Sequence, residues 1–147
     1  MAQSTSKSTT IPATAAEVLD VIAELADYPQ WAGGITKVDV LEEVDGWPMR
    51  ARFTMEQPPV SDTYVLDYTW DVDESGQGTV SWTLTERGTV LQKLDGAYQL
   101  TQRGDSTDVT YSLSVDITLP LPGMVRKAAE KKIIGTALDD LSARASG

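Results

Sequence analysis

The sequence contains neither cysteine nor histidine among its 147 residues. Without cysteine there can be no disulfide, no thiolate nucleophile and no zinc–sulfur site. Without histidine there is no Ser-His-Asp or Cys-His arrangement, and no imidazole that could serve as a base or a metal ligand. These two absences narrow the possible enzyme chemistry more than any motif in the chain does, and we expect neither a metal nor another cofactor.

Basic residues are also scarce: 12 Lys and Arg stand against 22 Asp and Glu, for a formal charge of −10 and a pI near 4.3. This balance argues against a nucleic-acid backbone or an anionic membrane surface as a partner. No window approaches the roughly 18 apolar residues of a membrane span, and the Ser/Thr-rich start of the chain has no apolar run. We therefore expect a soluble, cytoplasmic protein.

The length and the lack of repeats or linkers predict one domain over residues 1–147. Residues 3–11 are a candidate edge strand. Thr14 and Glu17 form a capping-box pattern that starts a helix ending near Ala26. Residues 27–31 predict one more short helical turn with Asp27 as its cap.

From Ile35 onward the pattern is almost wholly β. Asp45-Gly46 is a strong hairpin signal, and short connections imply antiparallel neighbours in sequence order. We predict six strands at 35–44, 47–57, 61–72, 79–86, 89–101 and 107–119. The turns at 57–60, 86–88 and 119–123 should meet at one end of the sheet and form the mouth of any cavity.

Aromatic side chains gather on the predicted inner face of this sheet: Tyr64, Tyr68, Trp70, Trp82, Tyr98 and Tyr111. A buried hydroxyl costs free energy unless it finds a partner, so four tyrosines are awkward for a dry core. They are easier to place if some hydroxyls line a partly wet pocket and orient a mostly apolar ligand. The alternative is that the rings fill space and reach polar atoms at the rim.

A helix is predicted from about Met124 to Ala145, after the rigid turn 120–123. Its apolar residues form two patches that do not share one face. The late patch contains Ile134, Leu138, Leu141 and Ala145, and the early patch contains Met124, Val125, Ala128 and Ala129. Gly135 lies between them and indicates either close helix-on-sheet packing or a slight kink. The early patch is either core or a surface that faces a ligand.

The sequence segments 27–31, 37–41, 94–98 and 119–123, together with the order of the predicted strands and helices, resemble the START-like helix-grip (SRPBCC) superfamily. Within it, they resemble the polyketide cyclase/dehydrase and coenzyme Q-binding-like branch. The resemblance implies an α+β fold in which a curved antiparallel sheet of about seven strands wraps round a long C-terminal helix. Two short helices should lie between strands 1 and 2. It also implies one START-like ligand-binding domain, with an apolar cavity between sheet and helix.

The function we expect is binding or transport of a hydrophobic small molecule, such as a lipid, a quinone or a polyketide-like compound. We predict no catalytic residue, because tyrosine is a poor base at neutral pH and no carboxylate lies on a predicted inner face. A polyketide cyclase/dehydratase that acts through pocket tyrosines, or a protein-interaction module, are the alternatives. The residues expected to bind the ligand are Trp31, Phe53, Met55, Tyr64, Tyr68, Trp70, Trp82, Tyr98, Tyr111, Leu113, Met124, Val125 and Ala128.

Overall fold

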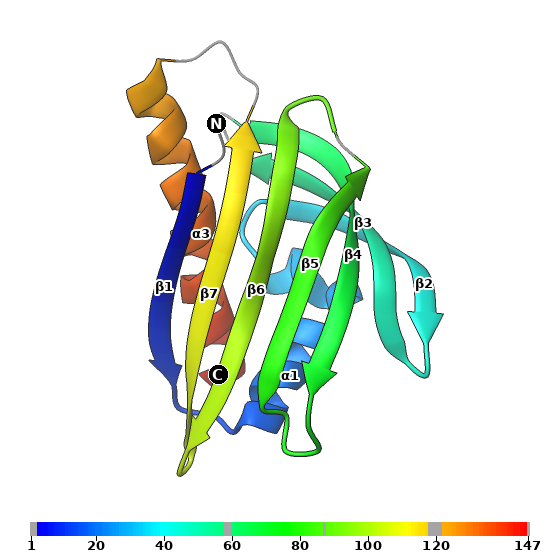
Figure 1. The fold of residues 1–147 in the computed structure, drawn as a ribbon, viewed down its shortest axis with the longest axis vertical. Coiled ribbons are helices and arrows are strands. Elements are labelled where there is room, and N and C mark those ends of the chain that lie inside the picture. Colours follow the sequence, from blue (N-terminus) through cyan, green and yellow to red (C-terminus); the bar gives the residue numbers. More distant parts are fainter. Residues whose placement is uncertain (1–2, 58–59, 87, 118–121, 147) are drawn as a thin grey trace.

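The computed structural model describes residues 3–57, 60–86, 88–117 and 122–146. The chain begins with strand β1 (Gln3–Ile11), followed by helix α1 (Ala15–Ala23), the 3₁₀ turn η1 (Leu25–Asp27) and helix α2 (Tyr28–Trp31). Six strands follow: β2 (Ile35–Val44), β3 (Trp47–Gln57), β4 (Val60–Val72), β5 (Gly78–Glu86), β6 (Leu91–Arg103) and β7 (Ser106–Ile117). Helix α3 (Gly123–Ser146) ends the fold (Figure 1).

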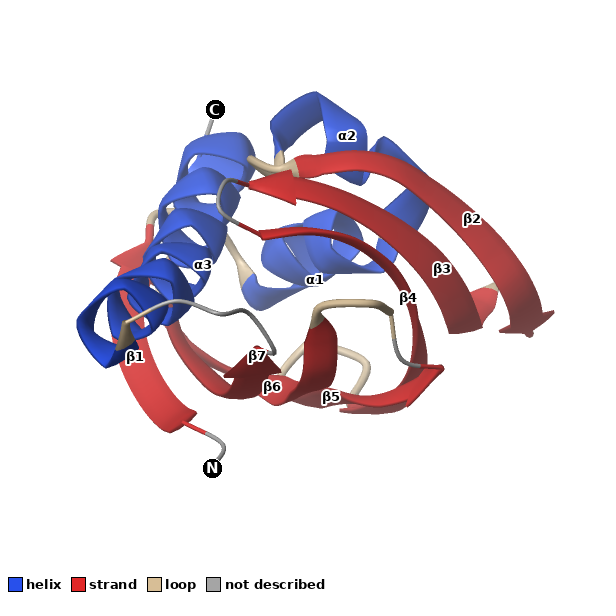
Figure 2. Cartoon of the chain, turned by 90° about the horizontal axis from the view of Figure 1, so that it is seen from above, coloured by secondary structure: helices blue, strands red, loops and turns tan. Residues whose placement is uncertain are grey.

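All seven strands form one antiparallel sheet in the order β1-β7-β6-β5-β4-β3-β2. Figure 2 shows that the sheet curves and that α1, α2 and α3 lie on its inner side. β2 to β7 follow one another as neighbours, and β1 closes the row by pairing with β7. This is the α+β helix-grip fold that the sequence predicted.

The strands form where period-2 alternation is clear. In β7 every second side chain from Thr107 to Ile117 is buried, and the side chains between them are partly or fully exposed. The hairpin between β2 and β3 turns at Asp45 and Gly46, with φ of 53° and 85°. Because such φ values suit the twist of a two-residue hairpin, the Asp-Gly pair fixes the register here. The predicted hairpin is confirmed.

The helical insert after β1 differs in detail from the prediction. α1 is capped as expected, since Thr14 and Glu17 bond each other's backbone N–H groups. However, α1 ends at Ala23 and not near Ala26, and η1 separates it from α2. Asp27 precedes α2 but makes no side-chain capping bond; its carboxylate accepts only a long bond from the Gln30 amide, at 3.5 Å.

Helix α3 packs on the sheet with its C-terminal half. Leu138 and Leu141 are buried, as predicted, and Ile133 is the third buried contact. We had expected Ile134, whose side chain lies outside the described set. Gly135 is not a site of close packing, because a Cβ added there would meet nothing within 4 Å.

Between Gly123 and Lys132, the side chains of α3 that the structure describes are exposed. Met124 and Val125 are 84% and 44% exposed, and Ala128 is exposed as well. Met124 precedes Ile133 by nine residues, or about two and a half turns at roughly 100° per residue, so the two side chains point to opposite sides of the helix. Once Ile133 faces the sheet, Met124 must point away from it. Met124, Val125 and Ala128 of the early patch are therefore neither core nor cavity wall.

None of the helices in the described ranges is long and apolar enough to cross a membrane.

Candidate functional site

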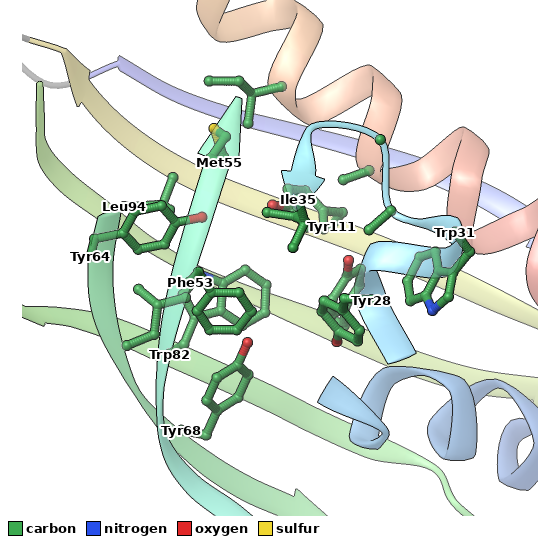
Figure 3. Close-up of a pocket in the computed structure, with 16 residues that line it drawn as sticks. Tyr28, Trp31, Ile35, Phe53, Met55, Tyr64, Tyr68, Trp82, Leu94 and Tyr111 are labelled. Atoms are coloured by element: carbon green, nitrogen blue, oxygen red, sulfur yellow. The ribbon is translucent and has the colours of Figure 1, made fainter. Parts of the chain in front are cut away.

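A cavity of about 90 Å³ lies between the inner face of the sheet, α2 and the middle of α3 (Figure 3). Its described walls are mostly aromatic and aliphatic. They comprise Tyr28, Trp31, Ala32, Gly33, Ile35, Phe53, Met55, Tyr64, Leu66, Tyr68, Trp82, Leu94, Tyr98, Tyr111, Ile133 and Ala137. The volume is below the range of about 300–1,000 Å³ that is usual for drug-sized ligands, so the space suits a molecule with about one ring.

The aromatic rings contact one another along the sheet. Tyr98 and Tyr111, on neighbouring strands, meet edge to face with centroids 4.8 Å apart. Trp82 lies 5.3 Å from Tyr98, and Phe53 stacks on Tyr64 at 5.7 Å. Such offset and edge contacts are the favoured geometries of aromatic pairs, so the rings hold one another in place. The wall is therefore preorganised.

Four tyrosine hydroxyls in this wall have no hydrogen-bond partner among the described residues. Tyr28 is different, because its hydroxyl donates to the carbonyl oxygen of Ile22 at 2.5 Å. Every fully enclosed polar side-chain atom in the described part of the chain has a partner. The unpartnered hydroxyls must therefore border open space; they belong to Tyr64, Tyr68, Tyr98 and Tyr111.

Burial keeps these groups protonated. Removal from water raises the pKa of Tyr64, Tyr68, Tyr98 and Tyr111, and the same effect raises that of Tyr28. For all but Tyr111, repulsion between neighbouring tyrosines raises the pKa further. At neutral pH the hydroxyls are hydrogen-bond donors and not bases.

No charged residue is found among the described side chains that line the cavity. Two carboxylates lie close by. Asp140 on α3 accepts the backbone N–H of Gly33 at 2.6 Å and so ties the loop between α2 and β2 to α3. Asp62 has the same strand parity as Tyr64 and contributes to the raised pKa of that tyrosine. The prediction that no carboxylate lies on the inner face overlooked Asp62.

The structure brings most of the predicted ligand-binding residues together around this cavity. Those that line it are Trp31, Phe53, Met55, Tyr64, Tyr68, Trp82, Tyr98 and Tyr111. Figure 3 shows the side chains of Tyr64 and Tyr68, from the same strand, reaching toward Phe53. That they contact a ligand stays a prediction.

The other predicted residues lie elsewhere. Trp70 stacks on Tyr68, but its indole N–H donates to the carbonyl oxygen of Pro48 at 2.7 Å, beside Trp47 and away from the cavity. Leu113 is buried yet packs under Gly96 instead of reaching the cavity. Met124, Val125 and Ala128 are exposed on α3 and do not line the cavity.

The cavity reaches the surface beside the loop between α2 and β2. Of its lining residues, Trp31, Ala32, Gly33, Ile35 and Ala137 are partly or fully exposed, while the others are buried. We had placed the mouth at three other turns. Parts of these turns, residues 58–59, 87 and 118–121, lie outside the described residues.

Sequence reasoning missed the side of the cavity that the helices and the start of β2 supply. Leu66 and Leu94 also line the cavity, although they were not among the residues expected to bind the ligand. Tyr28 could have been found from its place next to Trp31 in the predicted helical turn. Nothing in the sequence pattern marks Ala32, Gly33 or Ala137, which have little or no side chain.

The family model for polyketide cyclase/dehydrase and lipid transport matches residues 11–142. The chain therefore belongs to this family, whose members have the START-like fold described above. Among curated proteins, no sequence matches the chain significantly.

Solved structures share the fold at low sequence identity. A START superfamily protein from Mycobacterium smegmatis is 22% identical, with a TM-score of 0.83 over 97% of this chain and 96% of the other. The Zhui aromatase/cyclase from Streptomyces sp. R1128 is 16% identical, with a TM-score of 0.81 over 99% and 94%. A STAR-related lipid transfer protein from Xanthomonas axonopodis is 17% identical, with a TM-score of 0.81 over 98% and 86%.

Proposed function

We propose that this protein binds a small, largely apolar molecule in the cavity between the sheet, α2 and α3, as one START-like ligand-binding domain. The observation that carries the proposal is a set of buried tyrosine side chains whose hydroxyls border open space and make no hydrogen bond to a described residue. A polar atom left unpaired in an apolar interior costs free energy. Water or a ligand must satisfy these hydroxyls, and an aromatic wall favours a ligand with a flat ring.

Binding without chemistry is favoured over catalysis. The described lining has no histidine, cysteine, lysine or carboxylate, and its tyrosines stay protonated at neutral pH. The wall can therefore donate hydrogen bonds, but it supplies no group suited to remove a proton. The carboxylate of Asp62, which shares the strand parity of Tyr64, already accepts backbone N–H groups.

The test is to purify the protein, record its mass under native conditions, and extract any bound molecule into organic solvent. Two matched variants on α3 control the result. Ala137→Leu adds a side chain that points into the cavity, whereas Ala128→Leu adds the same side chain at an exposed position outside it. Bound ligand should be lost from Ala137→Leu and kept by Ala128→Leu. Equal ligand content in both variants would show that the ligand is not held in this cavity.

A cyclase is the second candidate, because donor hydroxyls could polarise a ketone and because the Zhui aromatase/cyclase has the same fold. Incubation with a reactive poly-β-ketone thioester distinguishes the two. If tyrosine is the proton donor of a reaction, one Tyr→Phe change should lower the rate by about 10²–10⁴ and leave binding nearly intact. If the protein only binds the thioester, the products of the incubation should be the same for the original protein and for the Tyr→Phe variant.

A further inference from the structure

The tyrosine hydroxyls give the cavity hydrogen-bonding capacity that a ligand can use. Tyr64, Tyr68, Tyr98 and Tyr111 are between 3% and 7% exposed, and each offers one O–H donor that the described part of the protein does not use. A phenol hydroxyl can also accept a hydrogen bond, and the indoles of the lining add further N–H donors. A bound molecule with an acceptor such as a carbonyl oxygen can therefore use the donors that the described wall leaves free.

The cavity is also poorly suited to a negative charge. The described lining contains no lysine or arginine to neutralise an anion. The two nearby carboxylates, Asp140 at the exposed rim and Asp62 beside Tyr64, would repel one. A charge that leaves water without a partner of opposite sign incurs a large desolvation penalty. Donor hydroxyls bind a carboxylate somewhat more strongly than a ketone, but this gain is smaller than the cost of stripping the ion of water.

We propose that the cavity selects an uncharged, flat molecule of about one ring that carries a carbonyl-type acceptor, and that it excludes carboxylates of the same shape. This inference rests on the proposed function, because it assigns the chemical class of the molecule bound there. Simple quinones and aryl ketones belong to the selected class. Fatty acids and aromatic acids, which are anions at neutral pH, do not.

Three para-substituted toluenes of nearly equal size test the proposal: 4-methylacetophenone, p-cymene and 4-methylbenzoate. The first has a neutral acceptor, the second replaces the acetyl group with isopropyl, and the third replaces it with a carboxylate. Affinities are measured by calorimetry at pH 7. We expect the ketone to bind about tenfold more tightly than p-cymene, the equivalent of one net hydrogen bond. The carboxylate should bind at least tenfold more weakly than p-cymene.

The outcomes separate this inference from the proposed function. If none of the three compounds binds, the proposed function fails. If all three bind with equal affinity, the cavity is a binding site but the selectivity does not exist. If 4-methylbenzoate binds as tightly as 4-methylacetophenone, the cavity is a binding site but the proposed exclusion of carboxylates is wrong.

Tyrosine variants show whether the hydroxyls cause the selectivity. Each Tyr→Phe variant keeps the ring that p-cymene contacts, so its affinity for p-cymene is an internal control. In a variant with phenylalanine at positions 64, 68, 98 and 111, the tenfold advantage of the ketone should disappear while p-cymene binds as before. An advantage that persists in this variant would refute the role of the hydroxyls. Stability is the second readout: none of these hydroxyls bonds a described residue, so the variant should unfold at no lower urea concentration than the original protein.

Discussion

The carboxylate of Asp62 holds the connection between β5 and β6 against β4, and its removal is a sharp test of the structure. One carboxylate oxygen accepts the N–H groups of Thr63 and Thr89, at 3.0 and 2.8 Å. The other accepts those of Val90 and Leu91, at 2.8 and 2.7 Å. Burial raises the pKa of Asp62, but the four N–H groups together outweigh it, so the pKa is below its usual value.

Asp62→Ala should lower the free energy of unfolding by about 2–4 kcal/mol. A hydrogen bond to a charged group contributes about 1.5–3 kcal/mol, and water can replace part of this contribution because Asp62 is partly exposed. Asp62→Asn should cost about half as much, because its carbonyl oxygen still serves Thr89 whereas its NH₂ group cannot accept the N–H of Leu91. Urea unfolding at pH 7, followed by tryptophan fluorescence, measures both. Asp71→Ala, at an exposed position on the same strand, is the control and should change stability by less than about 0.5 kcal/mol.

Gly88 supplies an independent check on the same contact. A Cβ at Gly88 would lie 2.1 Å from a carboxylate oxygen of Asp62, so Gly88→Ala must displace that carboxylate. Once Asp62 is alanine, the clash disappears. The double variant should therefore lose less stability than the sum of the single variants, with a coupling of about 1–2 kcal/mol. Strict additivity would refute the reasoning.

The contribution of Asp62 also has a defined pH dependence. Because its folded-state pKa is lowered from 3.8, its stabilising effect is complete above the pKa of the unfolded chain and is lost as the pH falls through the folded-state pKa. The difference in stability between the original protein and Asp62→Ala should be constant at neutral pH and shrink below about pH 4.

Three further predictions concern packing and ionisation. Gly96→Ala should cost about 1–3 kcal/mol in thermal unfolding, because its Cβ would lie 2.6 Å from the Ser112 carbonyl oxygen and 2.8 Å from the Trp82 ring; an unchanged melting temperature would contradict the register. Leu138→Ala should cost about 2–5 kcal/mol and Val125→Ala less than about 0.5 kcal/mol in urea unfolding, since only Leu138 is buried; equal losses would contradict the two roles of α3. The five tyrosines have raised folded-state pKa values, so their stabilising effect is complete below about pH 10 and lost above it; tyrosinate absorbance should rise together with the loss of circular dichroism, not before it.

The sheet was predictable because its signals are local. Alternation in β7 and the Asp45-Gly46 turn set strand identity and register without reference to the rest of the chain. Short connections then left sequential antiparallel neighbours as the simplest arrangement. The start of β6 was misplaced by two residues because Asp62, on a different strand, captures the N–H groups of Thr89 and Val90. A long-range contact overrode the local preference for β-branched residues.

The helical side of the site was not predictable in the same way. Periodicity shows which residues of α3 share a face, but the face that meets the sheet depends on how the whole helix is rotated. Leu138 and Leu141 are buried as predicted, and Ile133, on an adjoining side of the helix, is buried with them. Met124 and Val125, which were expected to bind the ligand, lie at the surface and do not line the cavity.

The cavity itself follows from an absence of side chains that no pattern in the sequence marks. Tyrosines on β4, β6 and β7 project inward by parity, and this part of the wall could be predicted. Across from them the lining includes Ala32, Gly33 and Ala137, where larger residues would occupy the space. Small residues on a helix face usually allow a neighbouring element to pack closely against the helix. Here the hydrogen bond from the Gly33 N–H to Asp140 holds the loop between α2 and β2 at the exposed rim of the cavity. The aromatic residues thus determine which molecules the cavity can recognise, and the small residues opposite them leave the space that forms the cavity.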